Sequence, residues 1–383
     1  MKKQQAGLDM KITVEQLLSL KKNEYVLIDT RNEYEIGYGK ISGNEIVYDD
    51  NFELNNKPKP GMKYIFYCRK GNKSSEIAKK YKEKGYDSYY LDGGYGAYLS
   101  YRMKNADLDE INQKVELSLQ KTYKSCIWSK FVKAIKEYKL INEGDKIAVC
   151  ISGGKDSMLM AKLFSLLKRY TEIPFDVTYI VMDPGYSEEN RKLIEHNAKA
   201  LKIDVDIFES DIFDSVFNIE KSPCYLCARM RRGYLYNYAK EKGCNKIALG
   251  HHYDDVIETI LMGMLYGAQI QTMMPKLHST NFEGMELIRP MYLIREDDIK
   301  KWRDHNNLFF LQCACRFTDS LSSFENEKSQ SKRLEIKELI KELKEKNPDV
   351  ENHIFRSVEN VNLNTIIAYK KDGKEHHFLD DYE

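Results

Sequence analysis

The chain has 383 residues, of which 42% are hydrophobic and 31% charged, which predicts two or three soluble domains with ample core. Its formal net charge of +1 neither demands nor excludes a nucleic-acid partner. No apolar run approaches ~20 residues and the first residues hold no apolar signal region, so we expect a cytoplasmic protein without a membrane segment.

The N-terminal third of the chain alternates predicted strands and helices, and the chain then becomes helical. Apolar runs rich in β-branched and aromatic residues predict strands at 25–29, 64–67 and 89–91, with an amphipathic helix before the last of them. Residues 106–140 contain no Pro or Gly and are rich in Glu, Lys, Gln and Leu, which predicts connecting helices. Their aromatic and aliphatic residues recur at helical spacing, so this segment is expected to pack against the next domain.

Cys68 follows the second of these strands and opens a loop that leads into the amphipathic helix. Backbone N–H groups converge at such a helix start, and Arg69, Lys70 and Lys73 add positive charge. Such an environment stabilises negative charge on sulfur, so Cys68 is expected to carry a thiolate or a persulfide. The alternatives are a free buried cysteine in a small α/β domain, or an inactive domain used for docking.

The stretch from residue 145 to residue 160 organises the second half of the chain. An apolar run at 147–151 predicts a buried strand, a glycine-rich turn follows, and an apolar-periodic helix begins at Met158. The glycines let N–H groups approach a phosphate, the helix start adds a favourable dipole, and Lys155 adds a positive charge. The turn lacks the G-x-x-x-x-G-K-S/T pattern, so it is not a Walker loop. The alternative to a phosphate-binding loop is an ordinary turn of an α/β domain. The candidate nucleotide-binding residues here are Ser152, Gly153, Gly154, Lys155, Asp156 and Ser157, of which Asp156 is also a candidate catalytic residue.

Two later predicted strands also end in polar residues, one at 177–182 and one at 246–249. Ligands of a parallel sheet bind at the carboxyl ends of its strands, so these polar residues are expected to face the nucleotide. Carboxylates there would hold Mg²⁺ on the triphosphate, and histidine would contact phosphate, although histidine is often simply a satisfied core residue. The candidates are Asp183, Gly250, His251, His252, Asp254 and Asp255.

The cysteines of the second half leave three interpretations open. Eight cysteines in a chain without a secretory signal favour metal or sulfur chemistry over a disulfide framework. Cys224 and Cys227 form a C-x-x-C pair, and Cys313 and Cys315 follow much later. A zinc site would need four ligands, and a redox pair would use the C-x-x-C alone. A [4Fe–4S] cluster held by three cysteines would leave one iron open for an exogenous sulfur atom.

The segment 10–103 resembles the rhodanese domain. The matching motifs are IDTRNEYE, the CRxGxxS loop at Cys68–Ser74, and GYDSYYLDGGYGAY. Two departures are Tyr98 in place of the usual Trp, and GYGKISGNE, which lacks the usual histidine. The resemblance implies that Cys68 is catalytic and carries persulfide sulfur, received from a cysteine desulfurase or another persulfide donor.

The segment 111–365 resembles the tRNA 2-thiocytidine synthetase family of PP-loop ATPases. The matching motifs are SGGKDS, PCxxCxRxRRG, IALGHHxDD, IRP with the following REDDI, and NPDVENHIFRSVENV. The resemblance implies that ATP adenylates a tRNA cytidine at position 32, with pyrophosphate released, and that sulfur then replaces its C2 oxygen. It also implies a homodimer and a [4Fe–4S] cluster on Cys224, Cys227 and Cys313, with Cys315 as the alternative third ligand.

Arginines directly after the C-x-x-C pair are candidate tRNA contacts; the alternative is a solvated helix face. These residues are Arg229, Arg231 and Arg232. The expected α/β organisation is a rhodanese-like domain (10–104), a helical connector (105–140), a Rossmann-like PP-loop domain of the adenine nucleotide alpha hydrolase type (141–320), and C-terminal helices with a polar tail (321–383). Two other functions stay open: thiolation of another base or acceptor, and a zinc-stabilised RNA-binding scaffold with degenerate domains.

Overall fold

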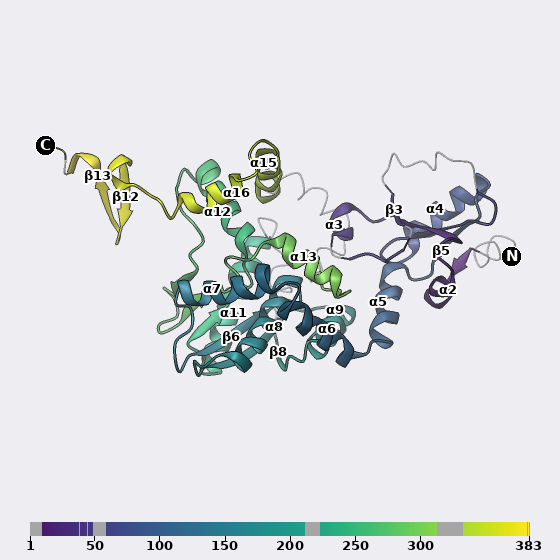
Figure 1. The fold of residues 1–383 in the computed structure, drawn as a ribbon, viewed down its shortest axis with the longest axis horizontal. Helices are drawn as coiled ribbons and strands as arrows, with labels where there is room; N and C mark the ends of the chain where they lie inside the picture. The colour runs from purple at the N-terminus through teal and green to yellow at the C-terminus, as the bar shows by residue number, and fades with distance from the viewer. Residues whose placement is uncertain are drawn as a thin grey trace.

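The computed structural model describes residues 10–37, 39–43, 45–48, 59–210, 223–311, 332–380 and 382. These residues form two units, each built on its own sheet, followed by a small hairpin (Figure 1). Both units combine a mainly parallel sheet with helices, so the predicted α/β class is confirmed. Among the described helices, none combines the length and the apolarity needed to cross a membrane.

The N-terminal unit has a five-stranded sheet in which every strand pair is parallel. Apolar side chains alternate to the two faces of its central strands, and separate clusters of buried residues cover the two faces. In spatial order the strands are β1 (Lys11–Ile12), β5 (Ser88–Leu91), β4 (Lys63–Tyr67), β2 (Tyr25–Asp29) and β3 (Glu45–Val47). The helices are α2 (Val14–Ser19), α3 (Glu33–Ile36), α4 (Asn72–Glu83) and α5 (Gly94–Lys104).

The second unit has a six-stranded sheet that is parallel except for one edge strand. Its largest apolar cluster joins the central strands to the helices on one face, and a second cluster covers the other face. In spatial order the strands are β10 (Lys276–His278), β11 (Glu286–Ile288), β9 (Lys246–Ala248), β6 (Lys146–Ile151), β7 (Asp176–Asp183) and β8 (Val205–Glu209). The helices are α6 (Leu108–Gln120), η1 (Lys124–Trp128), α7 (Ser129–Glu137), α8 (Lys155–Tyr170), α9 (Glu188–Ala200), α11 (Pro223–Glu241), α12 (Tyr253–Gly267), α13 (Glu296–His305), α15 (Lys332–Lys346) and α16 (Val350–Ser357).

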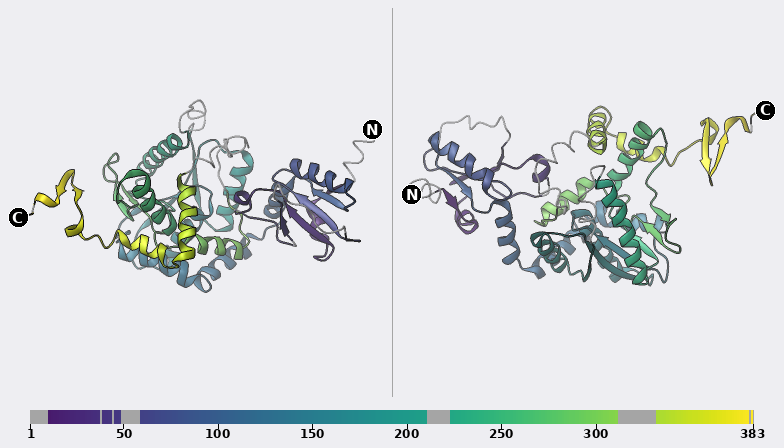
Figure 2. Two further views of the ribbon diagram at one scale, coloured as in Figure 1. Left: turned by 90° about the horizontal axis from the view of Figure 1, so that it is seen from above. Right: turned by 180° about the vertical axis from the view of Figure 1, so that it is seen from behind.

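The last part of the chain is a hairpin of β12 (Ala368–Lys371) and β13 (Lys374–His377), which the sequence analysis treated only as a polar tail. Asp372 and Gly373 form its turn, and both have positive φ angles, 50° and 76°. An Asp-Gly pair is typical of such two-residue turns, so the signal was present in the sequence. Figures 1 and 2 show the hairpin standing away from both units.

A buried lysine ties the connector helix α6 to α8. The ammonium group of Lys162, which has no exposed surface, donates hydrogen bonds to Asn112 Oδ1 (2.7 Å), Glu116 Oε1 (2.7 Å) and the Leu201 carbonyl (3.0 Å). Arg169 Nη2 also lies 2.7 Å from Glu116 Oε1. Burying a charge is costly unless it is paired, so this carboxylate makes the buried lysine tolerable.

Glu116→Gln is expected to lower the free energy of unfolding by about 2 kcal/mol in urea titrations at pH 7. Burial acts to raise the pKa of Glu116, but hydrogen bonds from Arg169 and Lys162 outweigh it and lower the pKa to about 2. The stabilisation is therefore complete above the ordinary value of 4.5, and it is lost as the pH falls from about 4.5 to about 2. Glu188→Gln, which removes an exposed pair, is the control; equal effects of the two variants would contradict the prediction.

Candidate nucleotide-binding and sulfur-transfer sites

The turn after β6 has the strand–turn–helix geometry that its sequence predicts. Helix α8 begins at Lys155 rather than at Met158, so the last residues of the motif form the first helical turn. Gly153 has a φ of +83°, and a Cβ there would lie 2.8 Å from Ile194 Cγ1, so glycine is required. Ser157 Oγ accepts from the Ser152 N–H (3.1 Å) and donates to the Gly154 carbonyl (3.0 Å), which keeps the turn closed around the helix start.

A cavity of about 310 Å³ opens at the carboxyl ends of β6, β7 and β9. Six of the predicted nucleotide-binding residues line it, namely Ser152, Asp156, Ser157, Gly250, His251 and Asp255. A Cβ at Gly250 would lie 3.2 Å from the Ser157 nitrogen, so a glycine lets the end of β9 approach the start of α8 closely. Met182, Tyr186 and Arg231 also line the cavity. The predicted strand ends therefore do converge on one site.

Lys155 lies beside this cavity as a buried cation between two carboxylates. Its Nζ is 3.1 Å from both Asp156 Oδ2 and Glu296 Oε1. Burial acts to lower the pKa of Lys155, but the two carboxylates outweigh it and raise the pKa. Burial likewise acts to raise the pKa of Glu296, yet Lys155, Lys337 and Lys300 hold it well below its usual range. Sequence reasoning did not identify Glu296 as part of the site.

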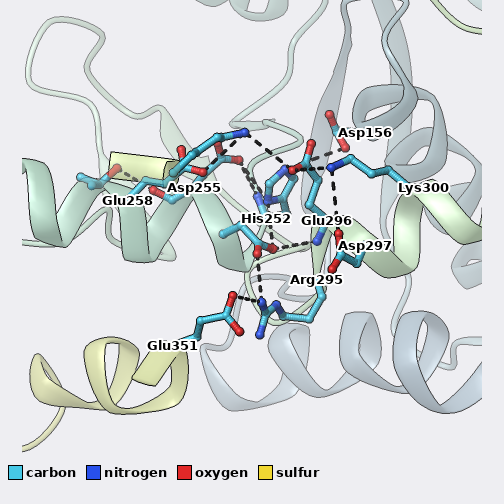
Figure 3. Close-up of polar contacts among 12 residues, drawn as sticks. Asp156, His252, Asp255, Glu258, Arg295, Glu296, Asp297, Lys300 and Glu351 are labelled. Atoms are coloured by element: carbon cyan, nitrogen blue, oxygen red, sulfur yellow. Dashed lines mark hydrogen bonds and ion pairs between the residues drawn. The ribbon is translucent and has the colours of Figure 1, made fainter. Parts of the chain in front are cut away.

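The two histidines after β9 differ in their surroundings. His252 is buried, and its Nε2 lies 4.0 Å from Asp156 Oδ1, while its backbone N–H donates to Asp255 Oδ2 at 3.0 Å (Figure 3). Burial first, and the charge of Arg289 second, lower the pKa of His251 to about 4, so its imidazole is neutral near pH 7. Among the described residues, His251 Nδ1 and Asp156 Oδ1 are buried and have no hydrogen-bond partner, which leaves both atoms able to bind a ligand.

The Cys68 loop forms a sulfur cradle at the start of α4. Cys68 Sγ accepts hydrogen bonds from Gly71 N (3.1 Å), Ser74 N (3.5 Å) and Ser74 Oγ (3.4 Å). Cys68 is 7% exposed, so the residue is largely buried but not completely excluded from solvent. Gly94, at the start of α5, packs against the backbone of this loop. Donors aimed at one sulfur stabilise negative charge on a thiolate or a persulfide.

Comparison with known proteins supports both halves of this description. A model of the PP-loop domain matches residues 123–315, and a model of the rhodanese-like domain matches residues 13–101. A tRNA-cytidine(32) 2-sulfurtransferase from Coxiella burnetii is 34% identical over 242 residues, which cover 62% of this chain and 90% of that protein. The chain belongs to the tRNA-cytidine(32) 2-sulfurtransferase family. Membership in this family makes it a transferase, and the resemblance found in its sequence is confirmed.

Two further matches are informative in different ways. A tRNA-cytidine(32) 2-sulfurtransferase 1 from Francisella philomiragia is 36% identical over 251 residues, covering 64% of this chain and 93% of that protein. A solved structure, the U34-tRNA thiolase NcsA from Methanococcus maripaludis with its [4Fe-4S] cluster, has 22% identity and a TM-score of 0.47. It covers 61% of this chain and 79% of that chain.

The predicted cluster ligands of this sulfurtransferase fall mostly outside the described structure. Cys224 and Cys227 lie at the start of α11, where only the backbone is described, and residues three positions apart on a helix share a face. Cys313 and Cys315 lie outside the described residues. Elsewhere, the described residues contain no group of three His, Cys, Asp or Glu side chains arranged to hold a metal ion. Of the predicted RNA contacts, Arg231 lines the cavity, Arg232 is exposed, and the side chain of Arg229 is not described.

Two predicted nucleotide-binding residues of this sulfurtransferase support the site from outside the cavity. Asp183 Oδ1 accepts from the N–H groups of Gly185 (2.9 Å) and Tyr186 (2.7 Å), which shapes the loop after β7. Asp254 Oδ2 accepts from the Glu296 N–H at 2.7 Å, at the start of α13. Asp254 Oδ1 also lies 3.1 Å from Arg295 Nη2, and the same guanidinium reaches Glu351 at 2.6 Å (Figure 3).

Asp254→Ala is expected to lower the free energy of unfolding by about 1–2 kcal/mol, because α13 loses the acceptor at its first turn. Its KM for ATP should rise less than threefold. Asp255→Ala removes a residue that lines the cavity, and its KM for ATP should rise about tenfold or more. Thermal unfolding and steady-state kinetics of both variants test this difference; an equal rise in KM would contradict it.

Proposed function

We propose that this chain uses ATP to adenylate cytidine 32 of a tRNA and then replaces the C2 oxygen with sulfur. In the first step the C2 oxygen attacks the α-phosphate, the bond to the β-phosphate breaks, and pyrophosphate leaves. In the second step hydrosulfide attacks C2, the C2–O bond breaks, and AMP leaves. A carbonyl oxygen is a poor leaving group and AMP is a good one, which is why ATP is needed. The observation that carries this proposal is the cavity in which the glycine turn, Asp156 and His251 meet.

The residues of this cavity suit a triphosphate. The N–H groups of the first turn of α8 and the buried charge of Lys155 would bind the phosphates. Asp156 Oδ1, which accepts no hydrogen bond from the described residues, and the nearby Asp255 carboxylate are the oxygen ligands that Mg²⁺ prefers, and bound Mg²⁺ would neutralise charge on the triphosphate. Neutral His251 would hydrogen-bond to phosphate without adding charge. We assign Arg231 and Arg232, with Arg229, to contacts with the tRNA backbone.

Sulfur would come from Cys68. Its cradle suits a persulfide, which releases sulfur when two thiols supply two electrons: the persulfide anion and two R–SH give the Cys68 thiolate, H₂S and R–S–S–R. Cys224, Cys227 and Cys313 are thiolate donors of the kind that holds a [4Fe–4S] cluster, and such a cluster would supply an open iron for the incoming sulfur. Cys315 is the alternative to Cys313.

Anaerobically purified protein, incubated with ATP, sulfide and tRNA, provides the test. We expect pyrophosphate, AMP and 2-thiocytidine in equal amounts, with 2-thiocytidine absent when position 32 is uridine. About four irons and four sulfides per chain, lost in Cys224→Ala, are expected alongside. Sulfur on another base would favour the broader thiolation alternative. Stoichiometric zinc without iron, with no AMP formed, would overturn the proposal in favour of a scaffold.

A further inference from the structure

The two units meet at an aromatic contact centred on Phe309. Its ring lies edge-on to Tyr95 (centroids 6.4 Å apart) and Tyr98 (6.1 Å apart), both on α5 of the N-terminal unit. The Arg102 guanidinium carbon lies 5.4 Å from the centre of the same ring. We call this set, Phe309 with Tyr95, Tyr98 and Arg102, the docking contact. Phe309, from the second unit, packs against an apolar cluster of the first unit.

The first side of the docking contact is bonded directly to the Cys68 loop. The Tyr95 N–H donates to the Cys68 carbonyl at 2.8 Å, and the Gly96 N–H donates to the Arg69 carbonyl at 3.0 Å. The start of helix α5 is therefore joined to the sulfur cradle by two backbone hydrogen bonds. Because the Phe309 ring contacts Tyr95 and Tyr98, it also constrains the position of Cys68.

The second side is bonded directly to the nucleotide-binding turn. The Phe309 carbonyl accepts from Asn197 Nδ2 at 2.7 Å, and the Leu311 N–H donates to the Gly153 carbonyl at 3.1 Å. The chain then continues toward Cys313. A further hydrogen bond joins the two units: Arg303, a buried residue of α13, donates from Nη1 to the Gly37 carbonyl of the N-terminal unit. The docking contact is thus connected by hydrogen bonds to the Cys68 loop on one side and to the glycine turn on the other.

We infer that Phe309 is a positioning residue that holds the Cys68 unit on the nucleotide-binding unit, so that sulfur from Cys68 is used within the same chain. This inference rests on the proposed function. Docking raises the local concentration of sulfur near the activated base, and a freely tethered unit would lose part of that gain. Loss of the ring should therefore slow transfer from Cys68 and leave sulfur from solution unaffected.

The test compares two sulfur sources on the full chain with tRNA and ATP. Thiosulfate with a thiol reductant requires Cys68, because the Cys68 thiolate takes its outer sulfur and releases sulfite. Sulfide bypasses Cys68. Phe309→Ala is expected to lower thiosulfate-driven 2-thiocytidine formation about tenfold, with sulfide-driven formation and sulfite release within twofold of the parent. Hydrogen exchange in α5 should become faster.

Matched variants separate docking from damage. Phe309→Leu, which keeps an apolar side chain, should retain an intermediate rate. Phe378→Ala removes the same side chain from the exposed C-terminal tail and should behave like the parent. Equal loss with both sulfur sources, or no loss with thiosulfate, would overturn the inference. If Cys68→Ala keeps its thiosulfate-driven rate, the proposed persulfide role fails first, and the exchange of α5 still reports whether Phe309 docks the units.

Discussion

Lys155→Met is expected to lower kcat/KM for ATP in pyrophosphate release by about 100-fold. Lys155 is a buried cation beside the cavity, and Asp156 and Glu296 each lie 3.1 Å from it. Without it, two carboxylates would remain next to the proposed position of the triphosphate and would repel it. The loss should therefore appear in both KM and kcat, because charge develops further when pyrophosphate leaves.

Lys168→Met serves as the control for this variant, since Lys168 lies on the same helix but is half exposed and pairs with the exposed Asp176. It should stay within twofold of the parent. Lys155→Arg keeps the charge in a larger group and should recover part of the loss. A Lys155→Met enzyme within threefold of the parent, with unchanged thermal stability, would show that the phosphates are held elsewhere.

Gly94→Ala is the second substitution with a large expected effect. Gly94 has a φ of +59°, and a Cβ there would lie 2.2 Å from the Cys68 carbonyl oxygen and 2.8 Å from the Gly71 nitrogen. Both are backbone atoms of the sulfur cradle, so the loop must move. We expect sulfite release from thiosulfate to fall at least about tenfold and the N-terminal unit to lose about 3 kcal/mol of stability.

Gly85→Ala distinguishes crowding from backbone strain. Gly85 has a comparable φ of +89°, but a Cβ there would meet nothing within 4 Å. It should cost about 1 kcal/mol and leave sulfite release unchanged, because only the strain of a left-handed backbone remains. Equal loss of sulfite release in both variants would contradict the crowding argument.

Local patterns predicted much of the arrangement of residues around the cavity. A strand, a glycine turn and a helix are adjacent in sequence, and parallel strands place their carboxyl ends together, so Ser152, Asp156 and His251 were predicted to meet. Glu296 was missed because its contact with Lys155 joins residues 141 positions apart. Asp254 and Asp255 were predicted together, yet neighbours on a helix point about 100° apart, and only Asp255 lines the cavity.

Other features of the chain could not be predicted from local sequence patterns. The docking contact joins α5 to a segment far along the chain, and nothing in the alternation of apolar residues predicts which distant aromatic ring will meet Tyr95 and Tyr98. The cluster ligands came only from the family resemblance, and Cys313 lies outside the described residues, so that assignment stays a prediction.

All strands of the N-terminal sheet come from one early segment of the chain, and this matters during synthesis on the ribosome. All five strands come from residues 11–91, so the whole sheet can close before the second unit has been translated. Tyr95 and Tyr98 are synthesised long before Phe309, the ring that they contact in the finished chain. Until Phe309 has been synthesised, the side of Tyr95 and Tyr98 that it contacts would lack this cover on the nascent chain. Chaperones that bind exposed apolar surface could bind there.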